Sequence, residues 1–265
     1  MHRRRAGPRR TLPESVMSGT VRYELTDGVA HLVLDRPDAA NAIDMDTALA
    51  LGDAVDTAVA DDAVRVLLLT GAGPRFCAGG DVAWMLGDDD RGARVEALAT
   101  VLDGVLVRLH SCAKPVVAAV QGAVAGAGLA VMLSCDVVVA EPATKFVAAY
   151  AAVGLSPDCG VSWLLPRAVG QQRALEMLLA QRVVTADEAL AWGLVGQVAD
   201  DPAAAAAELA ARMAAGPAYA LGQTRRLVRD AWVRDRGASG ADETRTITRA
   251  VQTPEADRLL SRFLA

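Results

Sequence analysis

The segment that decides the fold has the sequence KPVVAAVQGAVAGAGLAVMLSCDVVVA at positions 114–140. Val116–Val120 and Val137–Ala140 are apolar at every position, which is typical of strands that are buried on both faces of a parallel sheet. Between them, Gln121-Gly122 predicts a turn, and residues 126–134 predict a helix of small side chains. This order of strand, helix and strand indicates an α/β core whose parallel strands are covered by helices.

The sequence on either side of this segment continues the alternation of strands and helices. Two strands are expected around the turn Asp27-Gly28, and Asp44 is a candidate cap for a helix that ends near Ala60. Val64–Thr70 is expected to be another buried strand. The two strands around Asp27-Gly28 are expected at 20–25 and 29–34. The remaining expected elements are a short strand or bridge at Phe146, a short strand at Val195–Val198, and helices at 92–110, 160–169, 171–181, 185–192, 203–214, 217–234, 240–251 and 255–264.

Composition divides the chain into three parts. Residues 1–17 are rich in arginine and are predicted to be a disordered basic tail, residues 18–200 the α/β core, and residues 201–265 a helical module for packing and assembly. Hydrophobic residues make up 52% of the chain but aromatic residues only 4%, so Ala, Val and Leu must build the core.

Charge and cysteine usage exclude several classes of protein. The net charge is −5, and beyond residue 16 the chain carries 22 basic and 31 acidic residues, which argues against a nucleic-acid surface. No apolar run is long and uninterrupted enough to span a membrane, and no apolar stretch follows the N-terminal arginines as in a secretory signal. The four cysteines lack the paired spacing of zinc ligands, so we expect buried thiols, no metal site and a cytoplasmic location.

The first segment that could carry chemistry is a loop with the sequence RFCAGGD at 75–81. Its two glycines permit a positive φ or a close approach of the backbone to a ligand. If a helix begins near Asp81, the N–H of Gly80 projects from a helix start, where it favours developing negative charge. The alternative is an ordinary turn in which Asp81 only caps the helix.

The second such segment is QGAVAGAG at 121–128, which also leads from a buried strand into a helix. Free N–H groups at the start of that helix would point at an anion or a polarised carbonyl. No Lys-Ser or Lys-Thr follows, so the segment is not a phosphate-binding Walker loop, and its spacing is not that of a dinucleotide-binding fold. The alternative is close packing of a small-residue helix.

The third segment is GLSPDCG at 154–160, just before a predicted helix. Asp158 is a candidate helix cap, and alternatively a general acid or base in a mostly apolar cleft. The chain has only three histidines, His2, His31 and His110, and their positions give little support to a Ser-His-Asp or Cys-His site.

Together these segments resemble the enoyl-CoA hydratase/isomerase (crotonase) family over nearly all of residues 20–265. The resemblance implies a spiral of strand-strand-helix units, with C-terminal helices that assemble the chain into a homotrimer or a dimer of trimers. It rests on DRPDAANAI at 35–43, FCAGGDV at 76–82, the whole segment 114–140, GLSPDCGVSWLLPRAVG at 154–170, and ALEMLLAQRVVTADEALAWGLV at 174–195.

The resemblance also implies an acyl-CoA thioester as the substrate, with no cofactor beyond the coenzyme A of the substrate itself. In the family two backbone N–H groups hold the thioester oxygen, and the matching positions here are Gly80 and Ala127. Tyr150 is expected to line the acyl pocket, either with its hydroxyl free to bond substrate or water or as simple wall packing. The other substrate-binding positions that the resemblance suggests are Arg36, Ala78, Asp81 and Gly126.

Two departures from the family pattern bear on the reaction. Typical hydratases carry glutamates at positions that match Ala130 and Tyr150, so the usual pair of carboxylates is missing here. Asp158 matches an acid of the isomerase branches, and PDCGVSW at 157–163 most resembles the ring-epoxide phenylacetyl-CoA isomerases. The resemblance therefore implies a double-bond isomerase in which Asp158 removes a proton at one carbon and returns it at another.

Three alternatives remain open. The chain could be a hydratase with unconventional residues, or a protein of this fold that binds acyl-CoA without turnover. The position of Asp158 also serves as a nucleophile in haloaromatic-CoA dehalogenases of this fold, which place an aromatic residue where Tyr150 stands. Those enzymes need a histidine on the helix after the first loop, and residues 82–109 contain none.

Overall fold

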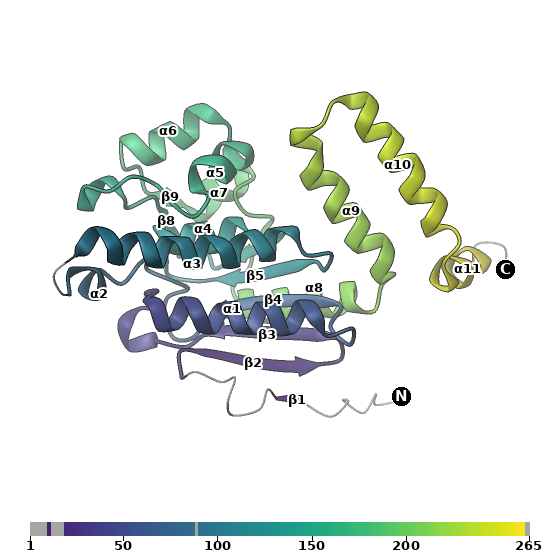
Figure 1. The fold of residues 1–265 in the computed structure, drawn as a ribbon, viewed down its shortest axis with the longest axis horizontal. Coiled ribbons are helices and arrows are strands. Elements are labelled where there is room, and N and C mark those ends of the chain that lie inside the picture. The colour runs from purple at the N-terminus through teal and green to yellow at the C-terminus, as the bar shows by residue number, and fades with distance from the viewer. Residues whose placement is uncertain (1–9, 12–18, 88–89, 263–265) are drawn as a thin grey trace.

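The structure is a computed structural model that describes residues 10–11, 19–87 and 90–262, and its core is a seven-stranded sheet (Figure 1). The strand order is β1-β2-β3-β4-β5-β7-β10. The first two pairings are antiparallel and the other four are parallel, as the sequence predicts for an α/β core. The strands are β1 (Arg10–Thr11), β2 (Val21–Thr26), β3 (Val29–Leu34), β4 (Val66–Gly71), β5 (Val116–Val120), β7 (Val137–Ala140) and β10 (Gln197–Val198).

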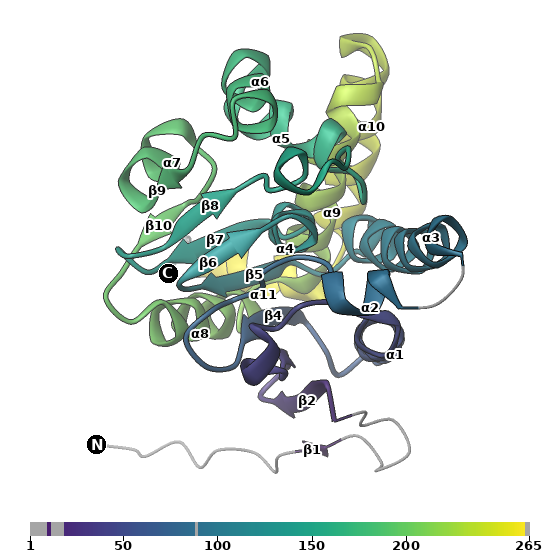
Figure 2. The ribbon, with the colours of Figure 1, turned by 90° about the vertical axis from the view of Figure 1, so that its left-hand side faces the viewer.

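The central strands are buried on both faces because their side chains alternate between two apolar clusters. On β4, Leu67 and Leu69 join the larger cluster, while Val66 and Leu68 join the smaller one on the opposite face. Figure 2 shows α1 (Met45–Ala60) and α3 (Arg91–Ser111) on one side of the sheet and α8 (Pro202–Ala214) on the other. The prediction of doubly buried strands is therefore confirmed.

α8 lies close to the sheet because its buried face consists of alanines. Ala206, Ala210 and Ala214 recur every fourth residue and pack against Val66, Leu68 and the neighbouring strands. Asp201 caps the helix through the amide of Ala204, and Pro202 occupies its first turn. The first helix of the predicted C-terminal module thus contributes to the core of the α/β fold.

A second, three-stranded sheet consists of β6 (Ala123–Ala125), β8 (Lys145–Val147) and β9 (Val184–Thr185). Within this sheet the sequence predicts a short strand only at Phe146, so β6 and β9 were not predicted. Strands of two or three residues are too short to show an alternation of apolar and polar positions. This sheet leads directly into α4 (Ala127–Leu133), whose first six residues are all buried.

Most predicted helices are present, with shifted ends. The stretch 217–234, predicted as one helix, is divided into α9 (Ala218–Asp230) and the 3-10 turn η3 (Ala231–Val233). Further elements between and after the strands are the 3-10 turns η1 (Pro37–Ala39) and η2 (Ala151–Val153), and the helices α2 (Val82–Leu86), α5 (Val161–Val169), α6 (Gln171–Leu179), α7 (Ala186–Trp192), α10 (Arg236–Ala250) and α11 (Pro254–Ser261).

α9 is attached to the core by two arginines that reach the C-terminal end of α3. The Arg225 side chain is only 5% exposed; it pairs with Asp136 and donates to the carbonyls of Leu109, His110 and Cys112. Arg229 also pairs with Asp136 and contacts the His110 ring. α10 then packs antiparallel to α9 beside the core (Figure 1).

Two expectations from composition can be compared with this fold. All four cysteines are free and buried, as expected. Within the described ranges, no helix combines the length and the apolar character needed to cross a membrane. Of the predicted tail, Arg10–Thr11 pairs with Leu25 and Glu24 of β2, and the rest of residues 1–17 lies outside the described residues.

The contact between α9 and His110 predicts a pH dependence of stability. Burial, together with Arg229 and Arg225, lowers the pKa of His110 from 6.5 to about 4. In acid the unfolded chain binds a proton before the folded chain does, so the free energy of unfolding decreases as pH falls from 6.5 toward about 4. Burial also lowers the pKa of His31, which adds to the same slope.

We expect His110→Gln to flatten this slope without abolishing it. Urea unfolding at several pH values measures the effect, and the difference at neutral pH, where both histidines are uncharged, gives the structural cost of the substitution. Equal slopes for wild type and variant would contradict the role given to His110.

Candidate active site

The first and second glycine-rich loops lie side by side. Phe76 donates its amide to the carbonyl of Gln121 at 2.8 Å, and Ala125 donates to the carbonyl of Cys77 at 3.0 Å. Cys77 and Val124 form an isolated parallel bridge, so the first loop lies against β6. The two loops, nearly fifty residues apart in the sequence, therefore act as one backbone unit.

Glycine is required at two positions where these loops touch. A Cβ on Gly122, whose φ is +61°, would lie 2.1 Å from the carbonyl oxygen of Pro74. A Cβ on Gly128, in the first turn of α4, would lie 2.4 Å from the carbonyl oxygen of Cys77. Real Cβ atoms do not approach so closely, so any larger residue would push the loops apart.

The amides of Gly80 and Ala127 both reach the same cavity. Around Gly80, Ile43 donates to the carbonyl of Gly79 and Asp81 donates to the carbonyl of Ile43, so the N–H of Gly80 points the other way. Ala127 is the first residue of α4 and has no acceptor within the helix. Within the described part of the chain, neither amide donates a hydrogen bond.

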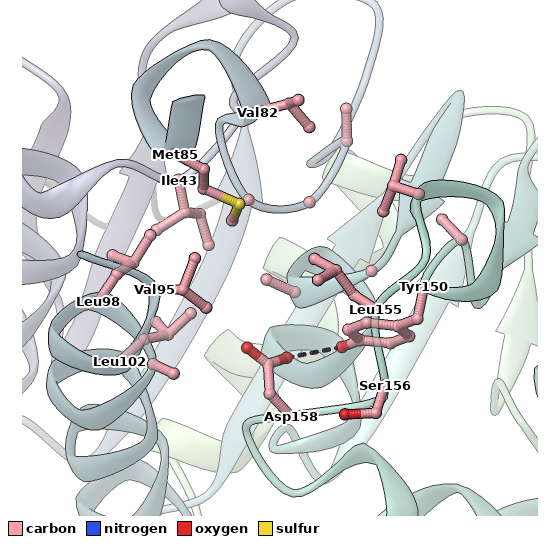
Figure 3. A pocket seen from close by; sticks show the side chains of 18 residues that line it. Ile43, Val82, Met85, Val95, Leu98, Leu102, Tyr150, Leu155, Ser156 and Asp158 are labelled. Carbon is pink, nitrogen blue, oxygen red and sulfur yellow. Dashed lines mark hydrogen bonds between the residues drawn. The ribbon is translucent and has the colours of Figure 1, made fainter. Parts of the chain in front are cut away.

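The cavity beside these amides has a volume of about 280 Å³ and is mostly apolar. Figure 3 shows two facing walls, one from α2 and α3 and the other from the segment that carries Tyr150 and Asp158. The wall from α2 and α3 was not predicted from the sequence. Val95, Leu98 and Leu102 follow a helical spacing that could have identified it. The apolar side chains of the two walls are Ile43, Val82, Met85, Val95, Leu98, Leu102, Val153 and Leu155.

Asp158 faces this cavity and does not cap α5. The residue before α5 is Gly160, and the helix has no side-chain cap, so the capping alternative for Asp158 is wrong. The Tyr150 hydroxyl donates to Oδ1 of Asp158 at 2.9 Å (Figure 3). Of the described residues that line the cavity, Asp158 alone is acidic.

Tyr150 is buried, and its hydroxyl has a partner within the protein. Neither expectation for this residue, a hydroxyl free for substrate or simple wall packing, describes the observed bond to Asp158. Burial, reinforced by the Asp158 charge, raises the pKa of Tyr150 far above its usual value. Tyr150 therefore remains a proton donor to Asp158 throughout the neutral range.

Arg36 and Asp81 lie outside this cavity lining, whereas Ala78 and Gly126 belong to it. Arg36 bridges Asp81 and Asp44, with Nη2 3.1 Å from a carboxylate oxygen of each. Asp81 caps α2 through the amide of Trp84, as the capping alternative predicts. Although burial opposes it, the Trp84 amide and Arg36 lower the pKa of Asp81. Substrate contacts for Arg36 and Asp81 stay predictions.

Metal ligation has no support in the described ranges. No group of three or more His, Cys, Asp or Glu side chains is arranged there to hold a metal ion. The candidate site therefore consists of two backbone donors, one carboxylate with a tyrosine partner, and an apolar wall.

Comparison with known proteins agrees with this arrangement. The family model "Enoyl-CoA hydratase/isomerase" matches residues 24–259. The chain is 38% identical to the 1,2-epoxyphenylacetyl-CoA isomerase of Escherichia coli K12 over 77% of its own length and 79% of that protein. It is 33% identical to 4-chlorobenzoyl coenzyme A dehalogenase-2 of an Arthrobacter species over 79% and 78% of the two chains.

Among solved structures, an enoyl-CoA hydratase from Polaromonas sp. JS666 superposes with a TM-score of 0.88 at 30% identity, covering 92% of this chain and 96% of that one. The fold is thus the α/β crotonase fold, ending in C-terminal helices, as the sequence resemblance implies. The chain belongs to the enoyl-CoA hydratase/isomerase family.

We expect Gly128→Ala to separate the two loops. A methyl group 2.4 Å from the Cys77 oxygen costs about 1–3 kcal/mol of stability. Displacing the Ala127 amide by a fraction of an ångström should lower turnover by up to about 100-fold. The measurements are thermal unfolding and steady-state rates on an acyl-CoA substrate.

Gly104→Ala is the matched control, because it is also a Gly→Ala change within a helix. Its Cβ would meet nothing closer than Arg108 at 3.6 Å, an ordinary contact. This variant should be as active as wild type and slightly more stable. Full activity of Gly128→Ala would show that the loop contact does not place the amides.

Proposed function

We propose that this protein is an acyl-CoA double-bond isomerase that forms a thioester enolate and moves one proton with Asp158. The observation that carries the proposal is a single carboxylate in an apolar cavity that also receives two unpaired backbone amides. Membership in the enoyl-CoA hydratase/isomerase family supports an acyl-CoA thioester as the substrate.

In the proposed reaction the thioester oxygen accepts hydrogen bonds from the N–H groups of Gly80 and Ala127. The Asp158 carboxylate removes a proton from one carbon of the acyl chain, and the electron pair left behind is delocalised onto the thioester oxygen as an enolate. Asp158 then returns the proton to another carbon of the conjugated system, so that the double bond has moved and the enzyme is unchanged. Preorganised donors of this kind typically contribute about 10²–10³-fold each.

The cavity favours isomerisation over hydration. Adding water needs one group to orient the water and another to deliver the proton. Ala130 is fully buried on α4 and carries no ionisable group, and the Tyr150 hydroxyl already donates a hydrogen bond to Asp158. Hydration with unconventional residues, and acyl-CoA binding without turnover, are the alternatives that an assay must separate.

Two further observations concern the substrate and the alternative of dehalogenation. The similarity to a 1,2-epoxyphenylacetyl-CoA isomerase makes an epoxide-derived CoA thioester a candidate substrate beside 3-enoyl-CoA. For dehalogenation, the described cavity lining lacks a histidine, since His110 packs against Trp163 and Arg229 at the far end of α3. We therefore place dehalogenation behind isomerisation.

Assembly into a homotrimer or a dimer of trimers remains a proposal for this chain. The C-terminal helices carry large apolar side chains on their surface, among them Trp232 at 64% and Ile247 at 68% exposure. Larger exposed apolar patches are typical of protein–protein interfaces, so this surface is a candidate for contact with another subunit. The remaining proposals are a CoA nucleotide near Arg36, Ala78 and Asp81, a cytoplasmic location, and no nucleic-acid or membrane partner.

We expect Asp158→Asn to lower turnover by about 10²–10⁴-fold, because general acid–base catalysis contributes that much. KM should change little, since the amide keeps the size of the carboxylate. Ultraviolet absorbance of the conjugated thioester measures the rate with 3-enoyl-CoA, and chromatography of the products measures it with an epoxide-derived CoA thioester.

Asp103→Asn is the matched control for this variant. Asp103 lies on α3 close to Cys159 but does not line the active-site cavity. It should retain wild-type rates. Equal rates for wild type and Asp158→Asn would overturn the assignment of Asp158, and hydration of crotonyl-CoA above background would favour the hydratase alternative. Binding by calorimetry without conversion of any substrate would favour the non-catalytic one.

A further inference from the structure

The hydrogen bond between Tyr150 and Asp158 links the residue before η2 to the third candidate segment, residues 154–160. Tyr150 stands at the start of η2, directly after Ala149, which has a φ of +60°, and its ring is buried. Asp158 precedes Cys159, which has a φ of +48°. Two residues in the left-handed region thus direct the tyrosine and the carboxylate toward each other across eight positions of chain.

This bond makes the two carboxylate oxygens of Asp158 inequivalent. Oδ1 accepts the Tyr150 hydroxyl at 2.9 Å, and the other oxygen, Oδ2, points into the cavity (Figure 3). A carboxylate held at one oxygen cannot rotate freely about its Cβ–Cγ bond, so Oδ2 keeps a constant direction relative to the apolar wall.

The described lining of the cavity contains no Lys, Arg or His side chain that could pair with Asp158. The titratable group beside Asp158 is the Cys159 thiol on the same loop, and Asp103 on α3 lies close to Cys159. Burial and the Asp158 charge raise the pKa of the Cys159 thiol, so it stays protonated and neutral.

A hydrogen bond to an ionised carboxylate is stronger than one between neutral groups and favours the charged form. Tyr150 thus fixes one oxygen of this half-buried carboxylate. It offers the substrate no competing proton, because its own hydroxyl proton lies on the bond to Oδ1.

We propose that Tyr150 is a positioning residue that locks the Asp158 carboxylate through Oδ1, so that Oδ2 alone exchanges the proton with the acyl chain. The role of Tyr150 depends on the proton-transfer function proposed for Asp158. This positioning role also gives a function to the tyrosine at the position where typical hydratases carry a glutamate.

The kinetic test is Tyr150→Phe, which removes the hydroxyl and keeps the ring. Loss of a hydrogen bond to a charged group should lower kcat by about 10- to 100-fold, with KM nearly unchanged because the cavity wall is preserved. Tyr219→Phe, on α9 and away from the cavity, is the matched control and should behave as wild type.

A second measurement needs no substrate. The chain contains only three tyrosines, Tyr23, Tyr150 and Tyr219, so uniform incorporation of 3-fluorotyrosine gives three ¹⁹F signals that single Tyr→Phe variants assign. The Tyr150 signal should shift in Asp158→Asn, because the carboxylate that accepts its hydroxyl is replaced. The signals of Tyr23 and Tyr219 report whether each variant retains the native fold.

The outcomes separate this inference from the proposed function. Unchanged kcat in Tyr150→Phe, with Asp158→Asn inactive, would overturn the role of Tyr150 and leave the isomerase proposal standing. A Tyr150 signal that is the same in wild type and Asp158→Asn would also overturn it. Full activity of Asp158→Asn would contradict the proposed function itself, whatever the fluorine spectrum shows.

Discussion

The close approach of the two glycine-rich loops is the constraint on which the rest of the site depends. Each loop leaves a buried parallel strand, and the bridge between Cys77 and Val124 joins them backbone to backbone. The approach is possible because Gly122 and Gly128 lack a Cβ at points where one would meet a carbonyl oxygen. The amides of Gly80 and Ala127 reach one cavity as a result, and their directions are set by main-chain bonds that are independent of side-chain rotamers.

An apolar cavity gives these few polar groups a large effect. Hydrogen bonds and charges act more strongly where water is excluded, and an unpaired charge there is costly. The wall from α3 makes the cavity apolar, and the Tyr150 hydroxyl provides a hydrogen-bond partner for Asp158. Typical hydratases carry two glutamates at the positions that match Ala130 and Tyr150. Here the cavity contains one acid, Asp158, whose partner is the phenol of Tyr150.

Much of the fold and part of the site follow from the sequence. Strands such as β4 and β5 are uniformly apolar, and the glycine-rich motifs mark where backbone must approach backbone, so both loops were identified. The wall of Val95, Leu98 and Leu102 was overlooked although its spacing is helical. The short strands β6 and β9 carry no periodic signal. The expected cap on α5 was wrong because Gly160, with φ of +79°, begins that helix without a side-chain partner.

The sequence by itself determined the order of strands and helices and the two glycine-rich turns, and it made Asp158 the candidate acid for proton transfer. These features depend on local composition, because burial on both faces demands apolar residues and close backbone contact demands glycine. Only the tertiary structure decided that the Tyr150 hydroxyl binds Asp158 and that Arg36 and Asp81 pair with each other outside the cavity. Such pairings depend on how distant segments converge and on left-handed backbone at Ala149 and Cys159, which no local pattern of residues specifies.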